Sequence, residues 1–366
     1  MTFFKENRKT FGEAKNPLVM IGRISLLLGI ILVCIVGFKM YQYINSNNIT
    51  LEEGQEYVLT IPTGYTYDEV YVMLEEKEIL KNTFGFQIVA VLKKYPDLVR
   101  SGRYTIEAGM SNSELINMLR SGYQNIMKIT FNNVGFVEEM VGMVAKKIEP
   151  DSLALLQAIR NAELNRDYGF NERNVAALFI PNTYELYWNT TAEAFVYRMS
   201  MEFEAFWTEE RRRKAADLNL SLTEVTTLAS IVQKETLRRD EQPVVAGLYL
   251  NRLKKNWKLQ SDPTVIYALK EKYNNRDTVI RRVLYSDLKI VSDYNTYLNK
   301  GLPPGPICLP EIQAIDAVLN HEEHNYMYMC AKEDFSGCHN FAVNGTQHLI
   351  NRRKYTRALN RRKINR

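Results

Sequence analysis

The sequence predicts an α+β protein with a single N-terminal transmembrane helix, a small module after it and a larger, mainly helical domain with short strands. Three observations indicate this organisation: an uncharged apolar run near the start, two similar strand–turn–helix segments in the first third, and helical periodicity in most of the remainder. The length of 366 residues is enough for about two domains with separate cores.

The apolar run is long enough to cross a bilayer. No charged residue occurs between Ile24 and Phe38, and if Arg23 snorkels the span reaches back to Leu18. About 20 apolar residues are needed to cross the hydrocarbon core. A secretory signal peptide is the rival interpretation, but residues 39–43, KMYQY, offer no small-residue cleavage site.

The charges on either side of the run predict its orientation. Basic residues precede it and acidic residues follow it: Lys5, Arg8, Lys9, Lys15 and Arg23, then Glu52, Glu53 and Glu56. By the positive-inside bias we expect a cytoplasmic N-terminus over 1–22, a transmembrane helix over 23–44 and a linker over 45–55. Everything after the linker is then exported, so we expect a single-pass protein whose main domain is extracytoplasmic.

The small module is an internal repeat. Ile61–Leu74 and Ile106–Leu119 align at an offset of 45 residues, and each contains a short strand, a glycine turn and a capping box. Thr66 and Ser111 are the predicted N-caps, and Phe84–Lys94 is a further helix candidate. A strand–helix–helix–strand unit of this kind either binds glycans at its strand–helix turns or serves as a structural spacer.

The larger domain is predicted to be mainly helical. Its helix candidates are 136–147, 153–162, 192–207 and 222–237. In the segment FIPNTYELYWNTT, the sequence Pro181-Asn182-Thr183 predicts a turn. Tyr184, Tyr187 and Trp188 supply aromatic side chains that either pack on sugar rings or belong to the core.

One glutamate lies on the apolar side of a predicted helix. In the segment SIVQKETLRRDE, helical spacing places Glu235 on one stripe with Leu228, Ile231 and Val232. Gln233, Lys234 and Arg238 are predicted to point elsewhere. A carboxyl in such a setting either forms a buried ion pair or internal cap, or has its pKa raised by desolvation, which suits a general acid.

Polar residues follow this glutamate at positions that suggest an oligosaccharide cleft. Asp262 is predicted to be an N-cap with Pro263 at the first helical position. Two glycines around a diproline predict a stiff loop over Gly301–Ile307. Many hydroxyl partners beside one proton donor are what a glycan requires. The candidate cleft residues are Glu241, Asn251, Arg252, Gln260, Asp262, Asn295, Tyr297 and Pro304.

Other functional classes lack their motifs. His321 and His324 are three residues apart, unlike the His-Glu-x-x-His pair of metalloproteases, and neither a Gly-rich phosphate loop nor a Gly-x-Ser-x-Gly elbow occurs. We therefore predict no metal and no cofactor. The basic residues are not interleaved with aromatic residues across a domain face, so no nucleic-acid partner is expected.

The positive charge is concentrated at the C-terminus. The formal charge is +5, but residues 351–366 carry eight basic residues and no acidic residue, so the remainder carries −3. This basic tail is either a solvated terminus or a contact for anionic lipids or an acidic partner.

The cysteines leave one pairing open. Cys330 and Cys338 flank a predicted hairpin loop, AKEDFSG, and a disulfide between them is one possibility in an oxidising compartment. Cys34 lies in the apolar run, and Cys308 has no evident mate.

The motifs LASIVQKET, NRL, LQSDPTVIYAL and YNTYLNKGLPPGPI, in this order, resemble those of the YceG-like endolytic murein transglycosylases, the MltG family. The anchor, the FIPNTYELY segment and HNFAVNGTQH extend the resemblance. It implies a LysM-like module over 56–125 and a transglycosylase catalytic domain over 126–350. It also implies cleavage of nascent peptidoglycan strands between MurNAc and GlcNAc without water, leaving 1,6-anhydroMurNAc ends.

The resemblance also assigns residues. The family commonly has glutamate at both acidic places of the motif around Glu235, whereas the first is Gln233 here, so Glu235 is the position that can carry the chemistry. The cleft residues from Glu241 to Tyr297, and the loop containing Pro304, match polar positions of the family. Asn182 departs from the acidic residue that relatives often have before Thr-Tyr. Expected partners are peptidoglycan strands, the membrane and peptidoglycan synthases.

Two alternatives stay open at this point. One is a non-catalytic, membrane-tethered peptidoglycan-binding scaffold. The other is a hydrolytic muramidase that uses Glu235 with Glu241 or Asp262.

Overall fold

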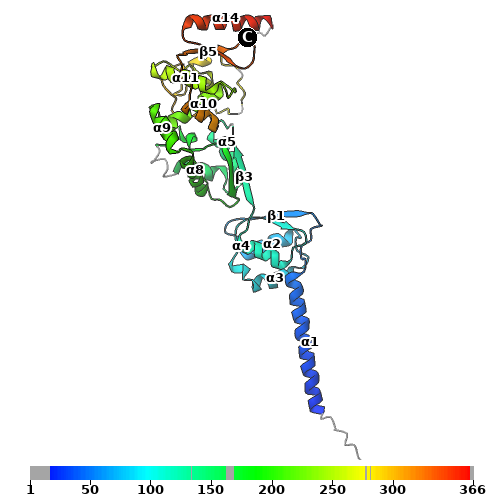
Figure 1. The fold of residues 1–366 in the computed structure, drawn as a ribbon. Helices are drawn as coiled ribbons and strands as arrows, with labels where there is room; N and C mark the ends of the chain where they lie inside the picture. Colours follow the sequence, from blue (N-terminus) through cyan, green and yellow to red (C-terminus); the bar gives the residue numbers. More distant parts are fainter. Residues whose placement is uncertain (1–16, 133, 162–168, 277, 281, 363–366) are drawn as a thin grey trace, which may run out of the picture. The chain divides into compact units, whose positions relative to one another are not determined.

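The computed structural model describes residues 17–132, 134–161, 169–276, 278–280 and 282–362 (Figure 1). The chain divides into two compact units, residues 1–125 and 126–366. Most of the predicted cytoplasmic segment 1–22, and the last four residues of the predicted basic tail, lie outside the described residues.

The first unit begins with helix α1, Pro17–Asn45. From Leu18 onward the helix is long and apolar enough to cross a membrane, and its most apolar window buries nothing against the rest of the chain. The helix is longer at both ends than the 23–44 span that the sequence predicts. Its C-terminal end is attached to the module, because the Asn112 amide donates to the Tyr43 carbonyl at 2.8 Å.

The module consists of a two-stranded antiparallel ribbon and three helices. Strand β1, Glu56–Ile61, pairs with β2, Gly102–Glu107, in the register Glu56↔Glu107 to Ile61↔Gly102. The helices are α2, Tyr67–Glu76, α3, Thr83–Leu92, and α4, Asn112–Ser121, with a 3-10 turn at Tyr95–Asp97.

Both predicted capping boxes of the repeat are confirmed. Thr66 exchanges hydrogen bonds with Glu69, and Ser111 does so with Glu114. Gly122 ends α4 in the left-handed conformation, at φ 75°. Helices α2 and α4 each bury one face in a common core, which includes Leu59, Ile61, Val70, Leu74, Phe86, Val89, Tyr104, Leu115 and Leu119.

The second unit opens with a second antiparallel ribbon. Strand β3, Ile126–Phe131, pairs with β4, Asn182–Tyr187. The predicted turn at 181–183 is therefore wrong: Asn182 and Thr183 lie in β4 because their backbones pair with β3. The Tyr184 ring is buried and stacks on Phe131 at 5.2 Å, whereas Tyr187 is exposed.

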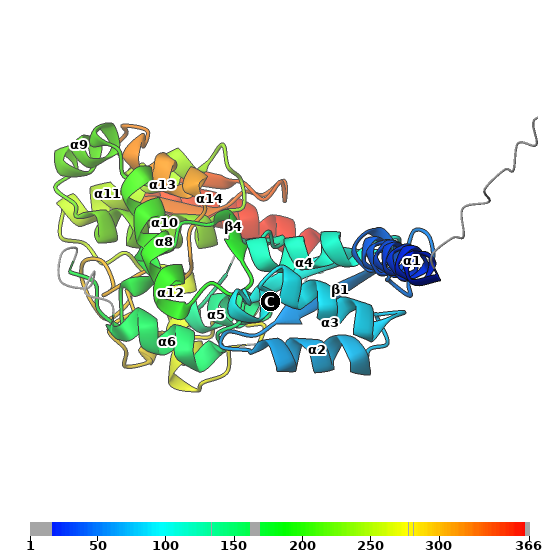
Figure 2. The same ribbon diagram turned by 90° about the horizontal axis from the view of Figure 1, so that it is seen from below.

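Helices are the main regular structure among the described residues of the second unit. They are α5 (Val137–Ala145), α6 (Ser152–Asn161), α8 (Ala192–Phe206), α9 (Glu209–Asp217), α10 (Leu222–Glu235), α11 (Gln242–Lys254), α12 (Asp262–Lys272), α13 (Ile312–Leu319) and α14 (Gly345–Arg361), with 3-10 turns at Val175–Leu178 and Asp287–Lys289. The four predicted helices correspond to α5, α6, α8 and α10. Helix α10 packs against α11 and α13, which lie beside it in Figure 2.

A hairpin and α14 complete the second unit. Strand β5, Tyr328–Ala331, pairs with β6, His339–Ala342, as the predicted hairpin requires. Cys330 lies opposite Asn340, not Cys338, and both thiols are free. Much of the predicted basic tail belongs to α14, whose Asn351 and Leu359 are buried, while its described lysines and arginines are all exposed to solvent.

Candidate active site

Glu235 is the last residue of α10, and the chain turns away at Thr236, which is extended. Its side chain is half-buried, and the Ser261 hydroxyl donates a hydrogen bond of 3.1 Å to its Oε2. Desolvation raises the pKa of Glu235 above its ordinary value, and the charge of Asp262 adds to this rise. The bond from Ser261 and the nearby His339 oppose it without cancelling it.

The alternative of a buried ion pair has no support at this position. Among the described residues, no lysine or arginine forms a salt bridge with Glu235. A carboxyl with a raised pKa and no cationic partner is able to hold a proton and release it. This is the arrangement of a general acid.

Helix α10 is buried on all sides over most of its length. It begins at a capping box between Ser221 and Glu224, and every residue from 225 to 233 is buried. The prediction that Gln233 points away from the core is therefore wrong. Its Oε1 accepts a 2.6 Å hydrogen bond from the Glu311 backbone amide, because α13 and the segment before it cover the face that the sequence pattern left to solvent.

Sequence reasoning missed Ser261, although it selected both neighbours. Ser261 is buried, and its amide donates to Thr296 Oγ1 at 3.0 Å. Gln260 adopts a positive φ of 50°, and its amide donates to the Thr296 carbonyl at 3.2 Å. The loop containing Thr296 thus fixes the backbone that directs the Ser261 hydroxyl at Glu235. A lone serine has no spacing signal that would have revealed this contact.

Tyr249 of α11 also lies beside the carboxyl. Its side chain is fully buried, and its hydroxyl has no hydrogen-bond partner of ordinary geometry in the part of the chain that the structure describes. Burial, then the charge of ionised Glu235, raise the pKa of Tyr249 well above its ordinary value. The hydroxyl therefore stays protonated and can donate to the carboxylate after a small movement.

Asp262 lies on the other side of Ser261 and is held by Tyr297. The predicted N-cap is wrong: Ser261 is the N-cap of α12 and Asp262 is its first helical residue. Asp262 Oδ1 accepts a 2.6 Å hydrogen bond from the Tyr297 hydroxyl. Asn295 is completely buried: its amide donates to the Leu288 and Ile290 carbonyls, and its Oδ1 accepts from the Tyr297 amide at 2.9 Å.

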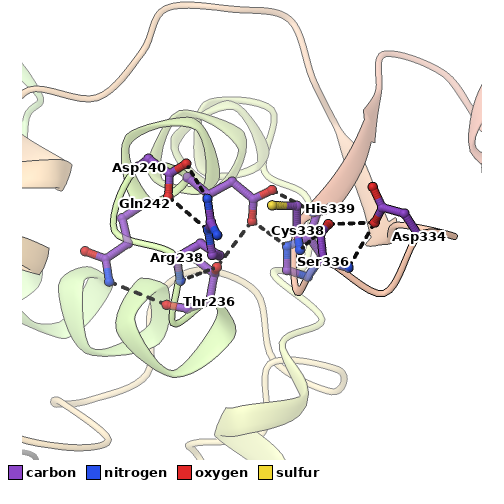
Figure 3. Close-up of polar contacts among 9 residues, drawn as sticks. Thr236, Arg238, Asp240, Gln242, Asp334, Ser336, Cys338 and His339 are labelled. Atoms are coloured by element: carbon purple, nitrogen blue, oxygen red, sulfur yellow. Dashed lines mark hydrogen bonds and ion pairs between the residues drawn. The ribbon is translucent and has the colours of Figure 1, made fainter.

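Glu241 holds the hairpin to the start of α11. Its Oε1 accepts from the His339 amide at 2.6 Å, and its Oε2 lies 2.8 Å from His339 Nδ1 and accepts from the Thr236 hydroxyl at 3.2 Å (Figure 3). Glu241 is nearly buried. Its carboxylate is fully engaged in these contacts.

Asn251 and Arg252 hold the chain that leads into β5. The Asn251 amide donates to the His324 carbonyl at 2.7 Å, and Arg252 Nε donates to the Met327 carbonyl at 2.9 Å. Arg252 Nη1 also donates to the Leu259 carbonyl. His324 Nδ1 accepts from the Tyr326 amide and its Nε2 contacts the Val244 carbonyl at 2.8 Å, so backbone groups occupy both ring nitrogens.

The diproline loop is anchored at its second glycine. A Cβ added to Gly305 would lie 2.0 Å from the Arg173 carbonyl oxygen, so only glycine fits there. At the end of the loop, the Ile307 amide donates to Ser230 Oγ of α10 at 3.0 Å. Pro304, in the loop itself, is half-buried.

Two of the pockets found among the described residues of this unit bear on the choice of centre, and neither is lined by Glu235 itself. One, of about 300 Å³, is lined by residues that include Lys234 and Pro263, the direct neighbours of Glu235 and Asp262. The other, of about 360 Å³, is lined by Glu138, Arg173 and Glu271 among others. Burial also raises the pKa of Glu271, which lines the second pocket, but the charges of Arg173 and Arg276 oppose this rise. We place the candidate centre at Glu235, because its raised pKa is combined with a hydroxyl donor aimed at the carboxyl.

The fold and the site define a two-unit protein with an apolar N-terminal helix and one protonatable carboxyl beside Ser261 and Tyr249. The chain belongs to the YceG-like family, whose sequence model matches residues 59–354.

The chain is also similar in sequence to named proteins and in fold to a solved structure. An endolytic murein transglycosylase of Streptococcus pneumoniae serotype 2 is 24% identical over 340 residues, which cover 84% of this chain and 60% of the relative. One of Bacillus subtilis is 25% identical over 296 residues, covering 75% and 79%. The chain thus spans about 60% of the length of the S. pneumoniae relative.

The crystal structure of a putative yceG-like protein from Listeria monocytogenes matches with a TM-score of 0.52 at 22% identity. The match covers 81% of this chain and 98% of that chain. At this identity the match supports the fold alone.

Proposed function

We propose that this protein is a membrane-anchored endolytic peptidoglycan lytic transglycosylase. It cleaves nascent glycan strands between MurNAc and GlcNAc and leaves 1,6-anhydroMurNAc ends. The observation that carries the proposal is the half-buried Glu235, whose pKa is raised by desolvation and which forms no salt bridge with a lysine or arginine among the described residues. The names of the relatives support the reaction type.

One carboxyl is enough for this reaction. Protonated Glu235 gives its proton to the glycosidic oxygen as the bond from that oxygen to C1 of MurNAc breaks. The C6 hydroxyl of the same MurNAc attacks C1, and the Glu235 carboxylate takes the hydroxyl proton, which returns the acid to its starting form. Ser261 donates to the carboxylate between the two steps, and Tyr249 is a second donor within reach.

The engagement of the other carboxylates favours lytic over hydrolytic cleavage. A hydrolase uses a second carboxylate as nucleophile or as base for water. Glu241 is occupied by His339 and Thr236, and Asp262 accepts a short bond from Tyr297. Asp262 is close enough to raise the pKa of Glu235, so it is the residue through which a muramidase would operate if the proposal is wrong.

The remaining assignments are also proposals. Gln260, Asp262, Tyr297 and Pro304 are the cleft residues that we expect to contact the glycan. For Glu241, Asn251, Arg252 and Asn295, the contacts above support a role in holding the cleft. The module over 56–125 is proposed to be LysM-like and to bind glycan. The N-terminus is proposed to be cytoplasmic and the second unit extracytoplasmic at the inner (plasma) membrane, with peptidoglycan synthases as candidate partners.

The products of digestion test the proposal. Uncross-linked glycan strands are incubated with the full chain in ¹⁸O-labelled water and analysed by mass spectrometry. We expect anhydro ends without ¹⁸O from the wild type and none from Glu235→Gln, while Glu185→Gln, which changes an exposed carboxylate of β4, matches the wild type. Labelled reducing ends would indicate a muramidase, and no product from the wild type would indicate a binding protein.

A further inference from the structure

The module has one helix with an apolar outer face. On α3, Phe84, Val91 and Leu92 are 61%, 66% and 56% exposed. The opposite face of the same helix is buried through Phe86 and Val89. A helix on the surface of a water-soluble module normally carries polar residues on its outer side, so this face requires a partner.

The other two module helices follow the usual pattern. The outer face of α2 is acidic, with Asp68, Glu69, Glu75 and Glu76 exposed around Val72. The outer face of α4, whose ten residues are all described, exposes Glu114, Asn117 and Arg120 and no large apolar residue. The apolar surface is therefore specific to α3 and is not a general property of the module.

Helix α3 is attached to the end of α1. The rings of Phe84 and Tyr43 meet edge to face, with centroids 6.2 Å apart. Gly85 is close to the same tyrosine, since an added Cβ would lie 3.0 Å from its Cδ1. The first turn of α3 is thus fixed beside the point at which α1 leaves its apolar stretch.

Helix geometry locates that point relative to a bilayer. The uncharged stretch of α1 ends at Phe38, and Tyr43 lies five residues further, or about 7 Å along the axis. The polar layer on each side of the hydrocarbon core is about 5 to 8 Å thick. Tyr43, and with it the start of α3, therefore lies at the level of the lipid head groups.

Cations lie at both ends of α3. Lys81 precedes the helix and Lys93 and Lys94 follow it, and the first and last of these are exposed. Lys93 donates to Asn117 of α4. An apolar face bordered by lysines at head-group depth matches the surface of a bilayer that contains anionic phospholipid.

We propose that the outer face of α3 lies in the membrane interface, with Phe84, Val91 and Leu92 among the upper acyl chains, so that the module is held flat against an anionic bilayer. This inference rests on the proposed crossing of the membrane by α1. The module then has a fixed orientation at the bilayer surface in place of free rotation on a tether.

Quenching by brominated acyl chains tests the contact. The full chain is reconstituted in vesicles of phosphatidylglycerol and phosphatidylethanolamine, as Val91→Trp and as the matched control Val72→Trp on α2. The native tryptophans Trp188, Trp207 and Trp257 all belong to the second unit, and their emission is subtracted with the parental chain. We expect the fluorescence of the tryptophan at position 91 to be blue-shifted and mostly quenched by the brominated acyl chains. The fluorescence of the tryptophan at position 72 is expected to be the same with and without bromination. Equal quenching at the two positions would overturn the inference.

A second measurement uses the unchanged chain. Vesicles containing a photoactivatable acyl chain are irradiated, and the adducts are mapped by mass spectrometry. Adducts on both α1 and α3 support the inference. Adducts on α1 with none on Phe84–Leu92 overturn the contact of α3 with the membrane but leave the anchoring by α1 intact. Release of the chain from vesicles by alkaline carbonate would overturn the anchoring by α1, and this inference with it.

Discussion

The Ser261 hydroxyl donates a 3.1 Å hydrogen bond to Oε2 of Glu235, across 26 residues of sequence. The bond favours the ionised carboxylate, whereas burial favours the protonated acid. The hydrogen bond and burial therefore have opposite effects on the pKa of Glu235. The proposed reaction requires this carboxyl first as the protonated acid and then as the ionised base. Ser261 is therefore a positioning residue for the acid and a stabiliser of the base.

Replacing Ser261 by alanine is expected to raise the pKa of Glu235 further, because the donor to its ionised form is removed. The acid then stays protonated to higher pH, so the alkaline limb of the kcat/KM profile moves upward. We expect kcat to fall about tenfold, since the carboxyl loses its orientation. Release of anhydro ends is measured across pH 5 to 9, in about one-unit steps.

Ser200→Ala is the matched control for this variant. Ser200 is a buried serine like Ser261, but it lies in α8 and its hydroxyl donates to a backbone carbonyl. It is expected to lower stability slightly and to leave the pH profile in place. An unshifted profile for Ser261→Ala would show that this hydrogen bond does not act on the catalytic proton.

Glu235→Gln is expected to stabilise the fold at neutral pH while it abolishes activity. The folded pKa of Glu235 is raised, so the folded state binds the proton more tightly than the unfolded state does. The stability that this proton contributes is fully present below the pKa that Glu235 has in the unfolded state, about 4. It is lost as the pH rises toward the pKa that Glu235 has in the folded state. Glutamine is neutral at every pH and avoids this loss, which is about 1.4 kcal/mol for every tenfold difference in proton affinity between the folded and unfolded states.

Thermal unfolding of both chains between about pH 4 and 8 measures this difference. The two melting temperatures are expected to approach each other at the acidic end and to separate as pH rises, with the variant higher. A wild type that is more stable than Glu235→Gln at pH 7 would mean that the carboxylate is paired in the folded state, contrary to the proposed acid.

Glu241→Gln is expected to destabilise the second unit by about 2 kcal/mol without changing the product. One of its oxygens becomes an amide nitrogen, which cannot accept from His339 or Thr236 and leaves buried donors unpaired. Urea unfolding measures the loss, and Asp240→Asn, which changes an exposed neighbour paired with Arg238, is the near-neutral control. If Glu241→Gln releases no anhydro products although its stability matches that of the wild type, Glu241 takes part in the reaction.

Local signals were sufficient for the elements that depend on neighbouring residues. Both capping boxes follow from a hydroxyl and a glutamate three residues apart, and the hairpin around residues 332–338 follows from turn residues between short apolar runs. The same reasoning failed by one residue at Asp262, because a proline is favoured throughout the first helical turn and does not by itself locate the N-cap.

Errors arose where tertiary packing decides. The stripe argument for Glu235 assumed that α10 has a solvent face, but α9, α11, α12 and α13 surround it, and Gln233 is buried. The charge pattern of the basic tail did not indicate that packing on β5 and β6 orders much of this segment as a helix, although its described basic side chains are exposed. Ser261 and Tyr249 reach Glu235 only through the fold, so no spacing in the sequence could select them.

The pair Gly247→Ala and Gly142→Ala separates helix propensity from packing. Both glycines lie inside helices, where alanine is favoured over glycine by up to about 1 kcal/mol. At Gly247 of α11, an added Cβ would lie 2.3 Å from the Glu322 carbonyl oxygen and 2.8 Å from His324 Nε2, whereas at Gly142 of α5 it meets nothing within 4 Å. Overpacking against backbone costs about 1 to 3 kcal/mol, which exceeds the gain in propensity.

We therefore expect Gly247→Ala to lower the free energy of unfolding by about 1 to 2 kcal/mol and Gly142→Ala to raise it by about 0.5 to 1 kcal/mol. Because Asn251 of α11 donates to the His324 carbonyl, the displaced backbone also disturbs the chain leading into β5 and, through His339, the contacts of Glu241. Activity of Gly247→Ala is then expected to fall with stability, and urea unfolding beside product release measures both. If Gly247→Ala were as stable as Gly142→Ala, the close approach of α11 to residues 322–324 would not exist in solution.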